Sequence, residues 1–318
     1  MTGGRERATL KSQRTIDKPS PDADQTSLGV FAEDDWTLAP DWTLNLGGRV
    51  DQVAIASDGS PTAPEGRRED TAWGGHLGLT CRLAEHWSAT GLAAASYRAP
   101  NILERYKNIT LGGNITEQGD PSLEPEKSTF FELGLHRTGR PVRLGLSAYA
   151  NFVDDLIDSK QVSPTLYRMA NVAKAEIYGA EAEAGWDFSP GWSLYGNLAY
   201  AAGRDVAAGE WLRFVAPLNG LAGVRQALAG GWWWSAETQW AAAQNLFPHD
   251  ADAAATGAWA ILNARVGYTL EAGRTTHEFA LGLKNLLDRR YANYLATARG
   301  ADLYEPGRDL YGSWTVQF

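Results

Sequence analysis

The chain has 318 residues, a formal net charge of −9 and 21% charged residues. Its acidic balance, with no basic stripe, excludes nucleic acid as an expected partner, and its single cysteine, Cys81, excludes an internal disulfide. No apolar run approaches the ~18 residues of a membrane-spanning helix, and the mean hydropathy is −0.34. Composition alone therefore fits an acidic soluble protein, although 13 Trp, 12 Tyr and 34 Gly are an unusual combination.

Alternating apolar and polar residues predict β-strands along most of the chain. In residues 42–50 one face carries Trp42, Leu44, Leu46, Gly48 and Val50, and the other carries Thr43, Asn45, Gly47 and Arg49. The same period of two recurs from Thr71, from Val142 and from Phe279. These stretches are longer than the usual strand of about five or six residues. They predict long antiparallel strands with one apolar face and one polar face.

Tight turns and long loops alternate strictly between these strands. The tight turns are predicted at residues 39–41, 84–86, 138–140, 189–191, 229–231 and 271–273. The long loops are predicted at residues 57–70, 99–126, 157–174, 203–211, 246–257 and 288–308. This alternation predicts an up-and-down meander with short turns at one end and long loops at the other.

Four of the six tight turns are followed directly by a tryptophan: Trp42, Trp87, Trp192 and Trp232. A ring of Trp at one height, bounding an apolar band whose reverse side is polar, is typical of an outer-membrane β-barrel. The alternative is a large soluble barrel or sandwich in which these tryptophans are core residues. Long strands, and long loops on one side only, favour the membrane barrel with Trp at the lipid headgroups.

The turns also predict the number of strands. Six tight turns join twelve strands, residues 309–318 add a thirteenth, and residues 5–16 fit a partial first strand ahead of a polar loop at 19–25. We therefore divide the chain into residues 1–25, with this strand and loop, and a barrel domain at residues 26–318. The expected fold is all-β, a transmembrane antiparallel up-and-down barrel, and about fourteen strands agree with the even number usual in bacterial barrels.

Five motifs resemble, in order, those of TonB-dependent outer-membrane receptors. Residues 28–53 resemble a strand pair of that family, and Tyr97, Arg98, Ala99 and Pro100 resemble its "FRAP" box. Pro121, Leu123, Pro125 and Glu126 resemble its "NPxLxPE" box, and Asn171, Gly179 and Glu181 resemble a later strand. Asn285, Tyr291, Pro306, Gly307 and Arg308 resemble its closing hairpin. Together the motifs run from about residue 28 to the last residue.

The resemblance implies a receptor for uptake of a scarce ligand across the bacterial outer membrane. In that family, a barrel of about 22 strands surrounds an N-terminal plug through which TonB acts. This sequence shows neither plug nor TonB box, so we expect the C-terminal part of such a barrel, with TonB coupling only through a missing plug. The ligand stays open among iron-siderophore, haem, cobalamin and other metal chelates. The alternative is a stand-alone passive channel like a porin.

No constellation of residues predicts an enzyme, a metal centre or a cofactor. We expect ligand binding by residues of the long loops, because Arg forks and Tyr rings suit an anionic, aromatic iron chelate: Arg98, Asn101, Arg105, Tyr106, Tyr167, Arg168, Tyr294 and Tyr304, with Tyr291 and Arg308 nearby. The alternative for Arg98 and Glu126 is a structural tie between the loop base and the barrel wall.

The five histidines bear on the choice of ligand. None lies in residues 102–119, which argues against haem. His76 and His136 fall on the polar face and are expected in polar networks, whereas His86 and His277 lie near tight turns. His249 lies beside two carboxylates in a long loop, where it is either a metal contact or solvated.

The last strand ends on an aromatic residue. Leu310, Gly312, Trp314, Val316 and Phe318 alternate with Tyr311, Ser313, Thr315 and Gln317, which predicts a lipid face and a lumen face. Phe318 resembles the C-terminal signal by which the outer-membrane assembly machinery recognises barrels. This resemblance leads us to expect that the missing part of the receptor lies at the N-terminal end.

Overall fold

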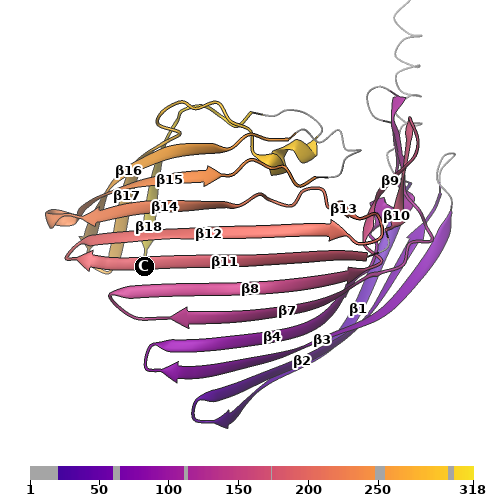
Figure 1. Ribbon diagram of the computed structural model, residues 1–318, viewed down its shortest axis with the longest axis horizontal. Coiled ribbons are helices and arrows are strands. Elements are labelled where there is room, and N and C mark those ends of the chain that lie inside the picture. Colours follow the sequence, from indigo (N-terminus) through magenta and orange to yellow (C-terminus); the bar gives the residue numbers. More distant parts are fainter. Residues whose placement is uncertain (1–20, 60–64, 111–113, 173, 248–254, 300–303) are drawn as a thin grey trace, which may run out of the picture.

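We describe a computed structural model of the chain, in which residues 21–59, 65–110, 114–172, 174–247, 255–299 and 304–318 are described. These residues form a large curved antiparallel sheet, with a small second sheet standing at one end of it (Figure 1). No helix within the described ranges has the length and apolar character needed to cross a membrane.

Thirteen long strands follow one another through the large sheet, each paired with its neighbour in the chain order. They are β1 (Ala23–Ala39), β2 (Trp42–Ser57), β3 (Gly66–Ala84), β4 (Trp87–Arg98), β7 (Glu126–Arg137), β8 (Val142–Asp154), β11 (Lys174–Ser189), β12 (Trp192–Asp205), β14 (Asn219–Ala227), β15 (Trp232–Ala241), β16 (Trp259–Ala272), β17 (Thr275–Lys284) and β18 (Asp309–Gln317). A two-residue strand, β13 (Glu210–Trp211), pairs only with β12. The up-and-down meander predicted from the sequence is confirmed.

All six predicted tight turns join consecutive strands of this sheet, and the twelve strands around them plus β18 give the predicted thirteen. The further strand predicted at residues 5–16 lies outside the described residues. Within them, the ladder runs from β1 to β18 as an open path.

Two predicted loops are shorter than expected. β1 begins at Ala23, so that Asp24 and Gln25 pair with Ala56 and Ile55 instead of lying in a polar loop. β3 likewise begins at Gly66, inside the loop predicted at residues 57–70. A strand needs apolar alternation only where one of its faces meets lipid, so the polar extensions of β1 and β3 beyond that band carry no strand signal in the sequence.

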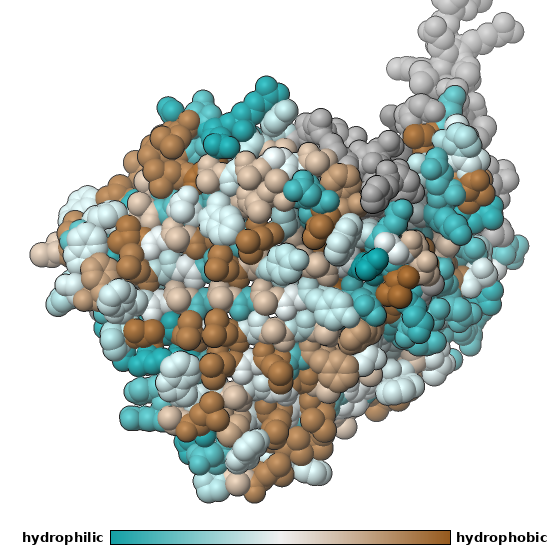
Figure 2. Space-filling view, in the orientation of Figure 1, coloured by the Kyte–Doolittle hydropathy of each residue, from teal (hydrophilic) through white to brown (hydrophobic). Residues whose placement is uncertain are grey.

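The two faces of the sheet differ as the alternation predicts. One face exposes large apolar side chains, among them Val30, Trp73 and Leu133, each at least 70% exposed. The other, which we call the inner face, carries polar networks. There the Asn45 amide donates to Glu33 Oε1 at 3.1 Å and Asp35 Oδ1 at 2.7 Å, and His76 Nε2 lies 2.5 Å from Asn45 Oδ1. Figure 2 shows brown side chains across the strands and mainly teal ones at the end that carries β9 and β10.

Aromatic residues gather on the outer face near the tight turns. β2, β4, β12 and β15 each begin with one of the four predicted tryptophans, Trp42, Trp87, Trp192 and Trp232. Ring contacts extend the belt: Trp186, Phe188, Trp192 and Trp234 follow one another at centroid distances of 5.5, 5.9 and 5.8 Å. The His277 ring stacks on Trp314 at 6.0 Å, which places this histidine in the belt as well.

The small sheet joins two long loops at the other end of the strands. The β4–β7 loop (residues 99–125) contains α2 (Ile102–Tyr106), β5 (Asn108–Thr110) and β6 (Thr116–Gln118). The β8–β11 loop (residues 155–173) contains β9 (Ile157–Ser163) and β10 (Leu166–Asn171). The order is β5-β6-β10-β9, with a parallel pair between β6 and β10. Two short 3-10 helices, η2 (Ala229–Gly231) and η3 (Tyr294–Arg299), lie elsewhere in the turns and loops.

The two faces of the sheet predict that a charged substitution destabilises the chain strongly at an outer-face residue and weakly at the adjacent inner-face residue. Leu146 lies on the outer face of β8, and Ser147, the next residue, lies on the inner face opposite Glu181. We expect Leu146→Arg to destabilise the chain in lipid bilayers by about 2–4 kcal/mol, because it places a charge in the hydrocarbon. The matched Ser147→Arg change should cost little. Urea unfolding followed by Trp fluorescence measures both, and equal losses for the two variants would contradict the assignment of faces.

Candidate functional site

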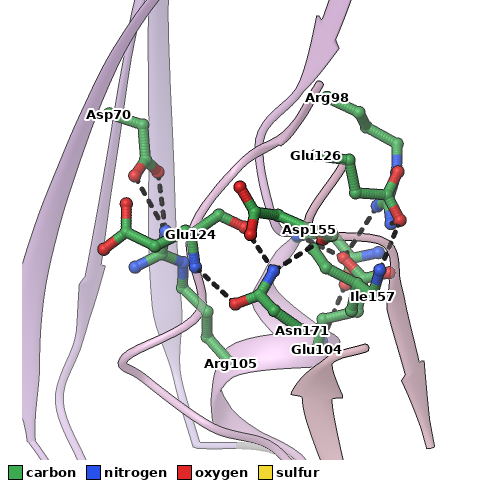
Figure 3. Close-up of polar contacts among 10 residues, drawn as sticks. Asp70, Arg98, Glu104, Arg105, Glu124, Glu126, Asp155, Ile157 and Asn171 are labelled. Carbon is green, nitrogen blue, oxygen red and sulfur yellow. Dashed lines mark hydrogen bonds and ion pairs between the residues drawn. The ribbon is translucent and has the colours of Figure 1, made fainter. Parts of the chain in front are cut away.

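The longest predicted loop is anchored by a buried arginine. Arg105, in α2, is 1% exposed, and its Nη2 donates to both carboxylate oxygens of Asp70 on β3, at 2.9 and 2.7 Å (Figure 3). Its Nη1 donates to the Pro121 carbonyl at 3.1 Å. Its Nε is buried without a hydrogen-bond partner among the described residues. The guanidinium of Arg105 therefore joins the strand wall to the far side of its own loop.

The helix that carries Arg105 has a complete N-terminal cap. The Asn101 side chain accepts a hydrogen bond from the Glu104 amide at 2.9 Å, and the Glu104 carboxylate accepts one from the Asn101 amide at 2.8 Å. This reciprocal capping box satisfies two backbone donors of a five-residue helix that could not form alone. The structure thus gives Asn101 a local role in starting α2.

Arg98 closes the base of the β4–β7 loop. Its Nε and Nη2 donate to the two oxygens of Glu126 at 2.7 and 2.8 Å, and its Nη1 donates to Glu104 at 2.8 Å. Arg98 and Glu126 are also partners across the β4–β7 ladder. Glu126 in turn accepts a hydrogen bond from the Ile157 amide at 2.7 Å. Arg98 therefore holds together the two strand ends that flank the loop, and Glu126 extends the link to β9.

Asn171 ties the two long loops to each other. Its amide nitrogen donates to the carbonyls of Glu124 at 2.9 Å and Asp155 at 2.7 Å, and its oxygen accepts from the Glu124 amide at 2.9 Å (Figure 3). Beside this contact, Leu123, Ile157 and Met169 form a buried apolar cluster. With the β6–β10 pair, these contacts make the two loops one unit.

Tyr106 lies in a second apolar cluster at the same end. It is 1% exposed and packs with Val53 and Ile55 of β2, with Ala99 and Ile102 at the edge. Its hydroxyl donates to the Gly66 carbonyl at 3.5 Å. The two described core clusters both lie at the long-loop end, where they pack the loops against the strands.

The closing-hairpin motif forms a second polar network. Asn285 is 2% exposed with a φ of 48°, its amide nitrogen donates to the Arg289 and Pro306 carbonyls at 2.8 and 3.4 Å, and its oxygen accepts from the Arg289 amide. The Arg308 amide donates to Asp288 at 2.8 Å. A Cβ on Gly307 would lie 2.6 Å from Asp288 Oδ1, so only glycine fits there without displacing this contact.

The remaining candidate residues are spread over several loops. Tyr167 and Arg168 lie on β10, where Arg168 donates to Gln118 at 3.4 Å. Tyr294 is 1% exposed, and its hydroxyl accepts from the Phe214 amide at 3.4 Å. Tyr304 is 53% exposed, with the Arg290 guanidinium 3.8 Å from its ring centre. His249 lies outside the described residues.

Packing contacts account for two other motif residues, Gly179 and Tyr291. A Cβ on Gly179 would lie 2.2 Å from the Tyr149 ring, so glycine makes room for that ring on the inner face. Tyr291 packs on Trp259 at 4.5 Å, and burial together with Glu305 raises the pKa of its phenol. Among the described residues no group of three or more His, Cys, Asp or Glu side chains is placed to hold a metal ion.

Sequence reasoning missed Asp70, the partner of Arg105. Asp70 falls at the end of the polar run Arg67-Arg68-Glu69-Asp70, inside a stretch predicted as loop. Nothing in that run distinguishes Asp70 from Glu69, which pairs with Arg67 at 2.7 Å on the surface. Only the pairing of β3 in the sheet brings Asp70 under α2.

Comparison with known sequences decides the family. The family described as "TonB dependent receptor-like, beta-barrel" matches residues 5–286. The chain belongs to this family. Its members are TonB-dependent receptors and transporters of the bacterial outer membrane, which is therefore the location of this chain.

Curated relatives match parts of the chain. An iron-regulated outer membrane virulence protein of Vibrio cholerae serotype O1 is 32% identical over 175 residues, covering 49% of this chain and 24% of that protein. The vitamin B12 transporter BtuB of Vibrio vulnificus is 28% identical over 121 residues, covering 36% of this chain and 18% of that protein. The matched stretches thus span about a quarter or less of these relatives.

Solved structures show the same fold. The copper transporter OprC has a TM-score of 0.78 at 22% identity, covering 93% of this chain and 47% of that chain. The unliganded ferric citrate transporter FecA has a TM-score of 0.71 at 18% identity, covering 92% of this chain and 45% of that chain. The chain therefore spans about half the length of these two solved chains.

The buried ion pair between Arg105 and Asp70 predicts that a single substitution at Asp70 strongly destabilises the β4–β7 loop. Asp70→Asn leaves the Arg105 guanidinium buried without a counter-charge, and we expect this to cost about 3–5 kcal/mol at the loop. Hydrogen exchange of residues 102–121 measures it. Glu69→Gln, which removes an exposed surface pair, is the matched control and should cost at most about 1 kcal/mol. Similar exchange in both variants would contradict the anchoring role of Arg105.

Because Asn171 ties the β4–β7 and β8–β11 loops together, we expect its loss to loosen both loops at once. Asn171→Ala removes three hydrogen bonds and should weaken the joined loops by about 2–3 kcal/mol. Limited proteolysis should then cut both the β4–β7 and the β8–β11 loops faster. Val162→Ala, at an exposed position on β9, serves as the control. Faster cleavage of only one loop would show that they are not one unit.

Proposed function

We propose that this chain forms the barrel wall and the ligand-capturing loops of an outer-membrane receptor for a metal chelate. The observation that carries the proposal is the joined pair of loops, held over the long-loop end of a wall of this family by Arg98, Arg105 and Asn171. We call the joined β4–β7 and β8–β11 loops the rim. The rim keeps a binding surface in place before the ligand arrives, which lowers the entropy cost of binding. The iron-regulated and metal-transporting names of its relatives point to the same class of cargo.

The geometry divides the candidate residues by role. We infer positioning roles for Arg98, Asn101, Arg105, Tyr106 and Tyr294, because carboxylates, backbone groups or apolar neighbours already occupy their side chains. Tyr167, Arg168 and Tyr304 remain the proposed ligand contacts from the sequence. We also infer that coupling to TonB runs through a plug domain, because at the other end of the wall the described strands are joined only by short turns.

The last strand supports a separate proposal about assembly. Leu310 and Trp314 on β18 are 66% and 64% exposed on the outer face, and Phe318 is fully exposed. Tyr311 faces inward, packed against the Gly282 backbone with Lys284 over its ring. We propose that lipid covers this outer face and that the assembly machinery reads it together with Phe318.

The receptor proposal predicts saturable surface binding. Outer-membrane vesicles from cells that produce the full chain are incubated with four radiolabelled probes: a neutral ferric trihydroxamate, a ferric tris-catecholate, cobalamin and haem. We expect at least one probe to bind saturably, with no binding to vesicles lacking the chain. Stepwise conductance of the chain in planar bilayers, with none of the probes bound, would instead support the passive porin-like channel.

A further inference from the structure

A cavity of about 630 Å³ opens between the β9–β10 hairpin and the segment that follows β12. Lys160 and Tyr167 line it from the hairpin, and Asp205, Glu210, Trp211 and Arg213 line it from the other side. Figure 1 places β9, β10 and β13 together at the long-loop end of the wall. We call it the β9–β13 cavity. Its volume is in the range of about 300–1,000 Å³ typical of small-molecule sites.

Several polar groups of this cavity have no protein partner. Within the described residues, no hydrogen bond or ion pair engages the Lys160 ammonium, the Glu210 carboxylate or the Tyr167 hydroxyl. Lys107, a loop cation outside the cavity, differs in this respect, because it pairs with Glu117 at 2.7 Å. The groups left open for a ligand at this end therefore include one cation, one anion and one hydroxyl in the same cavity.

Lys160 lacks a protein partner among the described residues, and the register of the β9–β10 hairpin gives a second reason to expect a ligand oxygen, anionic or carbonyl, beside it. Lys160 lies directly opposite Arg168 in the β9–β10 ladder. Like charges directly opposite each other destabilise a strand pair. Arg168 is partly compensated by Gln118, whereas Lys160 is not. An oxygen-rich group of a ligand beside Lys160 would relieve this repulsion.

The charge balance of the cavity limits the ligand class. Its described lining carries two cations, Lys160 and Arg213, and three carboxylates, Asp158, Asp205 and Glu210. A ligand with several negative charges would meet more carboxylates than cations. A neutral or zwitterionic ligand can satisfy both signs, and Tyr167 and Trp211 offer flat amphipathic surfaces to it. The sequence-based expectation of an anionic chelate rested on arginines such as Arg98 and Arg105, whose guanidinium groups are held by carboxylates.

We propose that the β9–β13 cavity binds a neutral or zwitterionic metal chelate and discriminates against polyanionic chelates. The proposal rests on the receptor function proposed above and narrows its ligand class. Lys160 and Tyr167 would contact oxygens of the chelate, Glu210 its amine or hydroxyl groups, and Trp211 its flat or apolar surface. Discrimination comes from the three carboxylates of the lining.

The test uses the full chain folded in detergent and isothermal titration calorimetry with two probes. One is a neutral ferric trihydroxamate and the other a ferric tris-catecholate with three negative charges. We expect the neutral probe to bind about tenfold more tightly. Trp211→Ala should weaken its binding about fivefold or more, with most of the affinity restored in Trp211→Phe. Glu210→Lys should shift the preference toward the tris-catecholate.

The outcomes separate the two proposals. Lys127→Met, which removes an exposed lysine outside the cavity, should leave both dissociation constants unchanged. Heat-modified gel migration verifies that each variant is folded. Binding of the neutral probe that is insensitive to Trp211→Ala and Glu210→Lys, or tighter binding of the tris-catecholate, would overturn the cavity proposal while the receptor function stands. No binding of either probe would overturn the cavity proposal, and a failure of all four vesicle probes would overturn the receptor function as well.

Discussion

A strand that crosses a bilayer must satisfy every backbone donor and acceptor within the protein, because the hydrocarbon offers none. Most features of this chain follow from that constraint. The strands are long and pair with their neighbours in chain order, since such hairpins complete a ladder with short turns. The period of two then divides each strand between a face for lipid and an inner face. The inner face carries networks such as that of Asn45, Glu33 and His76.

The same constraint explains where the core lies. A one-layer wall has no second layer to cover its faces, so it buries few large apolar side chains along its length. The two clusters of buried apolar residues among the described residues lie at the long-loop end, where Tyr106 packs on β2 and Leu123 packs with Ile157 and Met169. Loops of this length carry many backbone polar groups, and charged side chains help to hold these loops in place. Arg98 and Arg105 therefore stabilise these loops, through Glu126 and Asp70 of the wall and through Glu104 and the Pro121 carbonyl of the loop itself.

The wall could be predicted from the sequence because its signals are local. Each tight turn and each following Trp are adjacent in the chain, and alternation is visible within a single strand. The rim could not be predicted in the same way. Asn171 contacts Glu124 across 47 residues, and the parallel β6–β10 pair joins two loops that look merely polar in sequence. Motif resemblance identified Arg98 and Glu126 but left open whether they bind ligand or tie the loop. The cavity was missed because residues 158–167 and 205–213 share no sequence pattern.

At the long-loop end, the residues that hold the two joined loops in place are separate from the residues proposed to meet the ligand. Hydrogen exchange of the full chain, with and without the neutral ferric trihydroxamate, tests that separation most directly. We expect the chelate to add protection in residues 158–167 and 205–213, while residues 98–106, already held by their own contacts, stay unchanged. Added protection confined to residues 98–106 would contradict it, because the arginines of the β4–β7 loop would then be ligand contacts.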